Sequence, residues 1–122
     1  MSRFLKSMAA VAAAACLAAG VAAAQEKRSF SITTGGTGGV YYPLGGGLAN
    51  ILAKEIPGVA ATAEVTGGSV ANMQLIGSGK ADIAFSQVDA AWDALNGLDK
   101  FASGKLPIRA LAVLYPNHMH VV

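Results

Sequence analysis

The feature that most constrains this chain is a pattern that occurs three times: a short strand-like segment, a turn rich in glycine or serine, and a helical pattern. The strand-like segments are FSITT from Phe30, VAATAEVT from Val59 and ADIAFSQ from Ala81. Alternating strands and helices need crossover connections, which place the strands parallel in one sheet and the helices on its faces. We therefore predict an α/β fold with a largely parallel sheet and flanking helices.

Apolar residues between these strands recur at spacings of three and four, which is typical of one buried helix face. The first such pattern runs from Tyr41 to Ile56 and is stopped by Pro57 and Gly58. A second helix is predicted to begin with Ser69 as its N-cap. A third carries Val88, Ala91, Trp92 and Leu95, so we expect Trp92 in the core. The apolar segment 108–115, IRALAVLY, predicts a further strand.

Residues 1–24 are predicted to be a secretory signal peptide. Arg3 and Lys6 precede an alanine-rich apolar run that ends in three alanines, with cleavage expected before Gln25. A transmembrane anchor is the alternative, but so short and alanine-rich a run is a weak membrane span. We therefore expect residues 25–122 to form one modest domain in the periplasm.

Removal of the signal peptide changes what the composition implies. Arg3 and Lys6 are two of nine basic residues, so residues 25–122 carry seven basic and seven acidic side chains. No cluster of Lys and Arg is present, so we expect no nucleic-acid partner. The single cysteine, Cys16, lies in the signal, which leaves the exported part without disulfides or thiolate metal ligands.

The three turns are predicted to form a binding site. The carboxyl ends of parallel strands meet at one edge of the sheet, where open α/β folds bind their ligands. Each turn also opens a helix, so unpaired backbone amides and the positive end of the helix dipole point toward this edge. Glycine lets a ligand approach those amides closely. The sequence predicts a site for an anionic group that is held by amides and hydroxyls, because the three turns contain no Lys or Arg.

Individual residues of these turns receive different interpretations. Gly38 and Gly39 favour direct approach of a ligand, whereas Gly45, Gly46 and Gly47 favour close packing of the helix, with ligand approach as the alternative. Tyr41 shares the apolar stripe and is expected to pack, which leaves Tyr42 for the site. Ser86 and Gln87 end an apolar strand and favour ligand contact. Asp89 is expected either to cap its helix or to hold a ligand ammonium group.

Catalytic interpretations fit less well. Tyr41 stands where a dinucleotide-binding fingerprint needs glycine or alanine, and GGSVA at Gly67 lacks the last glycine of a nucleophile elbow. A hydrolase that uses Ser69 remains an alternative, although it needs a base. His118 and His120 could share a metal, but no carboxylate lies near them in sequence. We expect a protein that is not an enzyme, with no cofactor and no metal.

Three separated motifs together resemble one family. They are similar to the TAXI family of substrate-binding subunits of tripartite ATP-independent periplasmic (TRAP) transporters. The motifs are, in chain order, TGGTGGVYYPLGGGLANIL, ATAEVTGGSVANMQLIGSGKADIAFSQVDAAWDALNG and IRALAVLYPNHMHVV. The resemblance implies a periplasmic binding protein of type II, whose two lobes close on a small ligand. Residues 25–122 correspond to the first lobe, incomplete at its C-terminus and truncated before the second lobe. A non-functional truncated product is therefore a further alternative.

The resemblance also implies a function and a set of contacts. It implies capture of a small carboxylate or an amino acid such as glutamate, and delivery to the membrane-embedded TRAP permease subunits. It places the ligand contacts in the same three turns. The candidate ligand-binding residues are Thr37, Gly38, Gly39, Val40, Tyr41, Tyr42, Thr66, Gly67, Gly68, Ser69, Ser86, Gln87 and Asp89.

Overall fold

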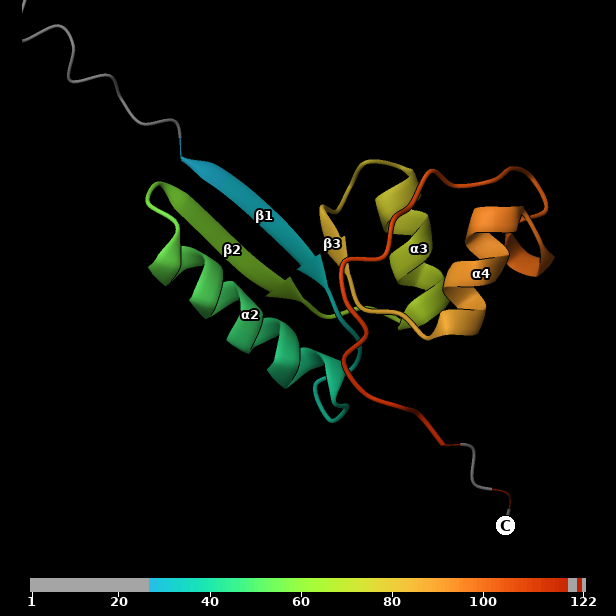
Figure 1. The fold of residues 1–122 in the computed structure, drawn as a ribbon, viewed down its shortest axis with the longest axis horizontal. Helices are drawn as coiled ribbons and strands as arrows, with labels where there is room; N and C mark the ends of the chain where they lie inside the picture. Colours follow the sequence, from blue (N-terminus) through green and yellow to red (C-terminus); the bar gives the residue numbers. More distant parts are fainter. Residues whose placement is uncertain (1–26, 119–120, 122) are drawn as a thin grey trace, which may run out of the picture.

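The structure is a computed structural model that describes residues 27–118 and 121. Its sheet consists of three parallel strands in the order β2-β1-β3, where β1 is Arg28–Thr33, β2 is Val59–Glu64 and β3 is Ile83–Ala84 (Figure 1). Arg28 pairs with Val59 at one end of β1, and Ile32 pairs with Ile83 at the other. The prediction of an α/β fold with a parallel sheet and flanking helices is confirmed. The predicted signal peptide lies outside the described residues.

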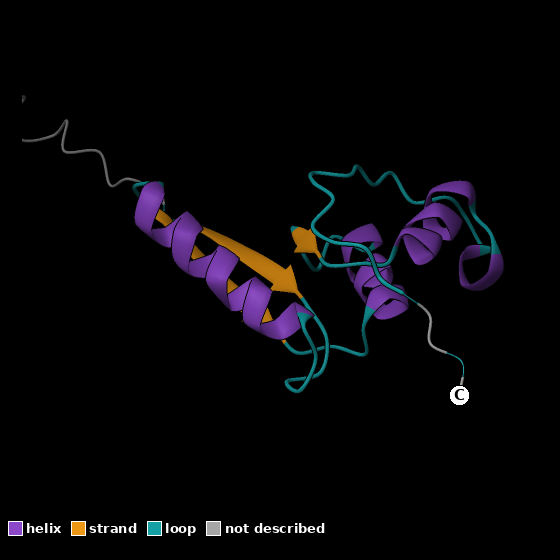
Figure 2. Cartoon of the chain, turned by 60° about the horizontal axis from the view of Figure 1, so that its bottom comes forward, coloured by secondary structure: helices purple, strands orange, loops and turns teal. Residues whose placement is uncertain are grey.

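The helices follow the predicted order. They are α2 (Tyr41–Glu55), α3 (Ser69–Gly77), α4 (Val88–Asn96) and the short 3-10 helix η1 (Asp99–Phe101). α2 ends just before Pro57, and α4 ends at Gly97, which has the left-handed φ of 69° that glycine adopts at low cost. α2 lies along β1 and β2, whereas α3 lies beside β3 and α4 packs on the far side of α3 (Figures 1 and 2).

The fold has two parts, one around α2 and the sheet and the other around α3 and α4, and each has its own cluster of buried side chains. Ile32, Ala49 and Phe85 form the first cluster, between α2 and the sheet. The second joins α3, α4 and η1 and consists of Met73, Ala94 and Phe101. β3 lies between the two parts, since Ile83 packs on the first cluster and its neighbour Ala84 on the second. This alternation is the normal result of successive strand side chains pointing to opposite faces.

Gly45 is where α2 comes closest to the sheet. It is buried, and a Cβ atom built there would collide with the side-chain methyl of Thr34 and lie 3.5 Å from both Ala63 and Phe85. Nothing lies within 4 Å of a Cβ atom built at Gly46 or Gly47. The predicted close packing is therefore confirmed for Gly45 and is wrong for the two glycines that follow it.

The predicted fourth strand does not form. Segment 108–115 has no strand structure, and Leu111 and Val113 are 80% and 93% exposed. A β-strand forms only where a neighbouring backbone pairs with its amides and carbonyls. In the described part of the chain, no strand pairs with segment 108–115.

Trp92 is not a core residue, which corrects a second expectation. Its side chain is 61% exposed, whereas Ala90 and Ala94 of the same helix are buried. The small residues let α4 pack closely on the neighbouring elements, and Ala94 belongs to the cluster with Met73 and Phe101. The apolar spacing predicted the helix correctly, but the alanine side of the helix is the side that packs.

Replacing Gly45 with Ala is expected to destabilise the fold by about 1–3 kcal/mol, because the added methyl group overpacks the contact with Thr34. Thr34 cannot turn away easily, since it is fully buried and its hydroxyl donates to the Glu64 carbonyl at 2.6 Å. Gly47→Ala is the matched control and should stabilise α2 by about 0.5–1 kcal/mol, because alanine favours the helix and the new atom meets nothing. Urea unfolding followed by circular dichroism measures both. Equal effects of the two substitutions would contradict the close approach at Gly45.

Candidate functional site

The three strand ends meet at one edge of the sheet, as predicted. Thr34 follows β1 directly, and the Thr66 hydroxyl lies 3.1 Å from its carbonyl oxygen. The Thr66 amide donates to the Gly35 carbonyl at 3.4 Å, and the Phe85 amide donates to the Thr33 carbonyl at 3.0 Å. The loops after all three strands are therefore in contact through their backbones.

The side chain of Asn72, on α3, holds this edge together. It is fully buried. Its Nδ2 atom donates to the carbonyls of Thr34 at 2.6 Å and Phe85 at 2.7 Å, and its Oδ1 atom accepts from the Thr66 hydroxyl at 2.6 Å. One amide group thus bonds to the chain after each of the three strands, and its donors and its acceptor are all satisfied.

Ser69 has a different role from the one predicted. Gly68 is the N-cap of α3, with a φ of 92°, and Ser69 is the first helical residue. The Ser69 hydroxyl accepts a hydrogen bond from the Gln87 amide at 3.0 Å. This bond joins the start of α3 to the start of α4, so Ser69 and Gln87 are in direct contact.

The loop 36–40 is not joined to the other two loops in the same way. Its residues are exposed, and the Gly39 amide donates to the Gly36 carbonyl at 2.9 Å. Among the described residues, no hydrogen bond connects this loop to the chain around Gly68 or Gln87. The structure therefore leaves Thr37 and Gly38 at the rim of the edge, apart from the residues that Asn72 holds.

Two of the amides expected to face a ligand are already used. The Gly39 amide bonds within its own turn, and the Gly68 amide donates to the Thr66 hydroxyl at 3.1 Å. In this conformation both amides donate within the chain, and contact of Gly39 or Gly68 with a ligand stays a prediction. Glycine still matters at position 68, because a φ of 92° is strained for any residue with a side chain.

Other amides at the starts of the three helices have no partner within their own helix. The hydrogen bonds that begin α2, α3 and α4 run from Leu44 to Val40, from Asn72 to Gly68 and from Ala91 to Gln87. Amides before the first intrahelical bond have no partner within the helix. For α3 these are the amides of Ser69, Val70 and Ala71, next to the bond from Ser69 to Gln87. Three helix starts at one edge create a region of positive potential, which the Asp89 carboxylate in the first turn of α4 partly offsets.

Aromatic side chains border the start of α2. The rings of Tyr41 and Phe85 are tilted by 34° with centroids 5.5 Å apart, so the packing role predicted for Tyr41 agrees with the structure. Tyr42 is half-buried at the same end of the helix. Burial raises the pKa of Tyr115 above its ordinary value, and the neighbouring Tyr41 raises it further. The segment after η1 therefore brings a second phenol close to Tyr41.

The polar side chains at the start of α4 bond locally. The Ser86 hydroxyl donates to the Gln87 carbonyl at 2.9 Å, and Oδ1 of Asp89 accepts from the Ala90 amide at 2.7 Å. Asp89 therefore bonds to an amide in the first turn of its helix, but the N-cap of α4 is Gln87 and no side chain caps the helix, so the capping prediction is wrong. Contact of Asp89 with a ligand ammonium group stays a prediction.

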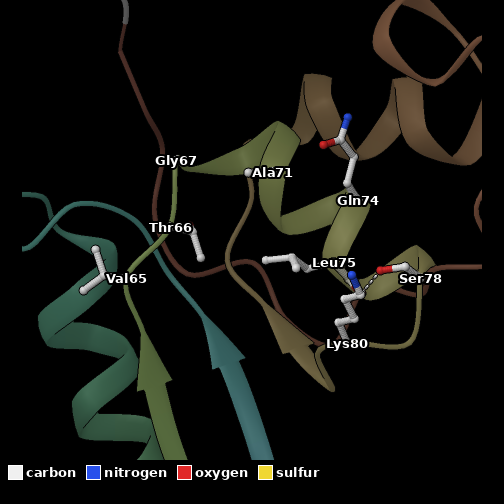
Figure 3. Close-up of a pocket in the computed structure, with 8 residues that line it drawn as sticks. All are labelled: Val65, Thr66, Gly67, Ala71, Gln74, Leu75, Ser78 and Lys80. Atoms are coloured by element: carbon white, nitrogen blue, oxygen red, sulfur yellow. Dashed lines mark hydrogen bonds between the residues drawn. The ribbon is translucent and has the colours of Figure 1, made fainter.

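An open hollow of about 510 Å³ adjoins the site between the end of β2 and α3 (Figure 3). Thr66 and Gly67 line both the hollow and the strand edge, and Lys80 is the one charged residue of the lining. In Figure 3 the amide of Gln74 points away from the strand ends. The complete lining is Val65, Thr66, Gly67, Ala71, Gln74, Leu75, Ser78 and Lys80.

Residues 27–118 and 121 contain no group of three or more His, Cys, Asp or Glu side chains that could hold a metal. His120, half of the histidine pair considered from the sequence, lies outside these residues. No helix of the described chain is long and apolar enough to cross a membrane.

Asn72 and Thr34 are the residues of this edge that the sequence did not point to. Both are fully buried and both bond to other strand ends. The only signal for Asn72 was a polar residue between Ala71 and Met73, which fits an exposed position equally well. Its role depends on backbone carbonyls 13 and 38 positions away in the chain.

The sequence profile of one family, described as the NMT1-like family, matches residues 32–122. The match includes all three strand-end loops and Asn72.

Replacing Asn72 with Leu is expected to destabilise the fold by about 2–4 kcal/mol, because it keeps the volume but leaves two buried carbonyls and a hydroxyl without their partner. Asn50→Leu is the matched control, since Asn50 is exposed on α2 and should change stability little. Urea unfolding and hydrogen exchange of the Gly68 and Gln87 amides are the measurements. Equal stability of the two variants would show that Asn72 does not hold the edge.

The raised pKa of Tyr115 makes stability depend on pH in the alkaline range. The folded state holds the tyrosine proton more tightly than the unfolded state, so this contribution is complete below about pH 10 and is lost as the pH rises further. Tyr41→Phe keeps the ring but removes the neighbouring hydroxyl, and should lower the pKa of Tyr115 toward its ordinary value. NMR titration of ¹³C-labelled tyrosine rings measures this, and an unchanged Tyr115 midpoint would contradict the proximity of the two phenols.

Proposed function

Because the chain belongs to the NMT1-like family, a family similar to periplasmic binding proteins, we propose that it captures a small anionic solute outside the cytoplasm. More narrowly, we propose the first lobe of a substrate-binding subunit of a TRAP transporter of the TAXI type, with residues 25–122 as the lobe and residues 1–24 as its export signal. The resemblance of the three sequence motifs supports this subtype.

The observation that carries the proposal is the convergence of three helix starts at an edge fixed by Asn72. The first amides of these helices offer hydrogen-bond donors, which a carboxylate accepts well. Hydrogen bonds within the protein already hold the loops around Ser69 and Gln87, so little order has to be gained when a ligand binds. The candidate ligand is a small carboxylate or a glutamate-like amino acid.

Each candidate residue has a role in this proposal. The rim of the strand edge consists of Thr37, Gly38, Gly39 and Val40. Its aromatic walls are Tyr41 and Tyr42. The start of α3 takes part through Thr66, Gly67, Gly68 and Ser69. The start of α4 takes part through Ser86, Gln87 and Asp89. A second lobe would close over this edge by a hinge motion, exclude water and strengthen the hydrogen bonds to the carboxylate.

The arrangement around Ser69 gives little support to the alternative, an exported hydrolase. The polar group bonded to its hydroxyl is the Gln87 amide, which is a donor and cannot act as a base. A serine nucleophile needs a base within hydrogen-bond reach. In the described chain, no histidine or carboxylate side chain bonds to Ser69.

Thermal unfolding of the full chain against glutamate, glutamine, dicarboxylates and 2-oxo acids tests the proposal. At a carboxylate concentration 100 times the Kd, binding should stabilise the fold by about 2.7 kcal/mol. Gly68→Ala should reduce the response, because the strained residue moves the start of α3. Gly79→Ala is the control, since Gly79 also has a positive φ of 71° and open space around it but follows α3 at its far end.

Two outcomes would count against the proposal. A folded chain that responds to none of these carboxylates would exclude them as ligands. Equal loss of response in the Gly68 and Gly79 variants would show that backbone strain, and not position at the strand edge, controls binding.

A further inference from the structure

Helix α4 presents an apolar stripe to solvent. Val88, Trp92 and Leu95 are spaced by four and three residues and therefore lie on one side of the helix. Their exposed fractions are 85%, 61% and 45%. We refer to these three residues as the α4 stripe. The opposite side of the helix, with Ala90 and Ala94, is buried.

The described fold does not use the α4 stripe for its own packing. None of its residues belongs to either cluster of buried side chains or to the partly buried residues around them. The backbone carbonyl of Trp92 accepts a hydrogen bond from the Asn96 side chain at 2.9 Å, and no hydrogen bond among the described residues involves the indole ring. An exposed tryptophan between two exposed aliphatic residues is typical of an interaction surface.

The charges of the helix indicate what kind of partner fits. Asp89 and Asp93 lie on α4, and the helix contains no Lys or Arg. No ion pair of the described residues involves either carboxylate. An apolar surface bordered by unpaired carboxylates complements a partner whose apolar surface is bordered by Lys or Arg. The same carboxylates oppose contact with an anionic lipid surface.

The α4 stripe is also continuous with the candidate ligand site. Val88 directly follows Gln87, whose amide is held by Ser69 at the strand edge. A partner on the stripe would therefore touch the helix whose first turn takes part in the site. A surface in this position can respond to whether the site is occupied.

We propose that the α4 stripe is a docking surface for a protein partner that presents an apolar patch bordered by Lys or Arg. The identity of this partner as the permease subunit rests on the proposed function. The docking chemistry itself rests on the exposure and the charges of α4.

The test uses the fluorescence of Trp92, which is the only tryptophan of the chain. The full chain is titrated with two synthetic helical peptides that share an apolar face of Leu and Phe, one bordered by Lys and Arg and the other by Glu. We expect a saturable blue shift with the basic peptide and none with the acidic peptide. Added salt should weaken the binding.

Variants that keep Trp92 locate the contact. Leu95→Ser should weaken binding of the basic peptide by about tenfold, because it removes an apolar contact directly beside Trp92 at one end of the stripe. Asp93→Asn should weaken it by about threefold and reduce its salt dependence, as expected for an exposed ion pair. Ile51→Ser is the control, because Ile51 is an exposed aliphatic residue like Leu95, with 58% of its surface exposed, but lies on α2.

Several results would overturn the inference. These are no shift with the basic peptide, an equal shift with both peptides, or an equal loss in the Leu95 and Ile51 variants. A blue shift with phosphatidylglycerol vesicles alone would assign the stripe to a membrane, and self-association in sedimentation that Leu95→Ser abolishes would assign it to a second copy. No carboxylate ligand takes part, so failure here is distinct from failure of the proposed function.

Discussion

The hydrogen bonds of Asn72 are the constraint on which the rest of this structure depends. Parallel strands end at the same edge, but nothing in their pairing holds the loops beyond them in a fixed relation. A buried side-chain amide does so here, because its two donors and one acceptor meet the chain after each strand. Since a buried polar group without partners is costly, the three loops have few alternative arrangements.

This constraint also explains why the two parts of the domain act together. The cluster under α2 and the cluster between α3 and α4 share no buried residue, and the two-residue strand β3 is a small connection between them. Asn72 belongs to α3 but bonds to Thr34 at the end of β1, so it joins one part to the other. The proposed ligand binding at this edge would therefore depend on the hydrogen bond between Asn72 and Thr34, although Asn72 itself is not one of the proposed ligand contacts.

Much of the fold could be predicted from the sequence because it depends on local patterns. The helix from Tyr41 is visible in its apolar spacing, and Pro57 and Gly97 mark helix ends directly. The location of the candidate site could also be predicted, since the ends of parallel strands must meet. The details of that site could not. Ser69 bonds to Gln87 across two loops, and the role of Asn72 exists only when three strand ends are already assembled.

The errors have one physical cause in common. Periodicity identifies an apolar side of a helix, but packing decides which side is buried, and in α4 the smaller alanine side allows the closer approach. Likewise, residues 108–115 have strand-like composition, yet a strand requires a neighbouring backbone. The sequence by itself determined the order of strands and helices and the edge at which their loops gather. Only the tertiary structure decided which amides stay open, which polar side chain joins the loops and which apolar residues face solvent, because these depend on contacts between residues far apart in the chain.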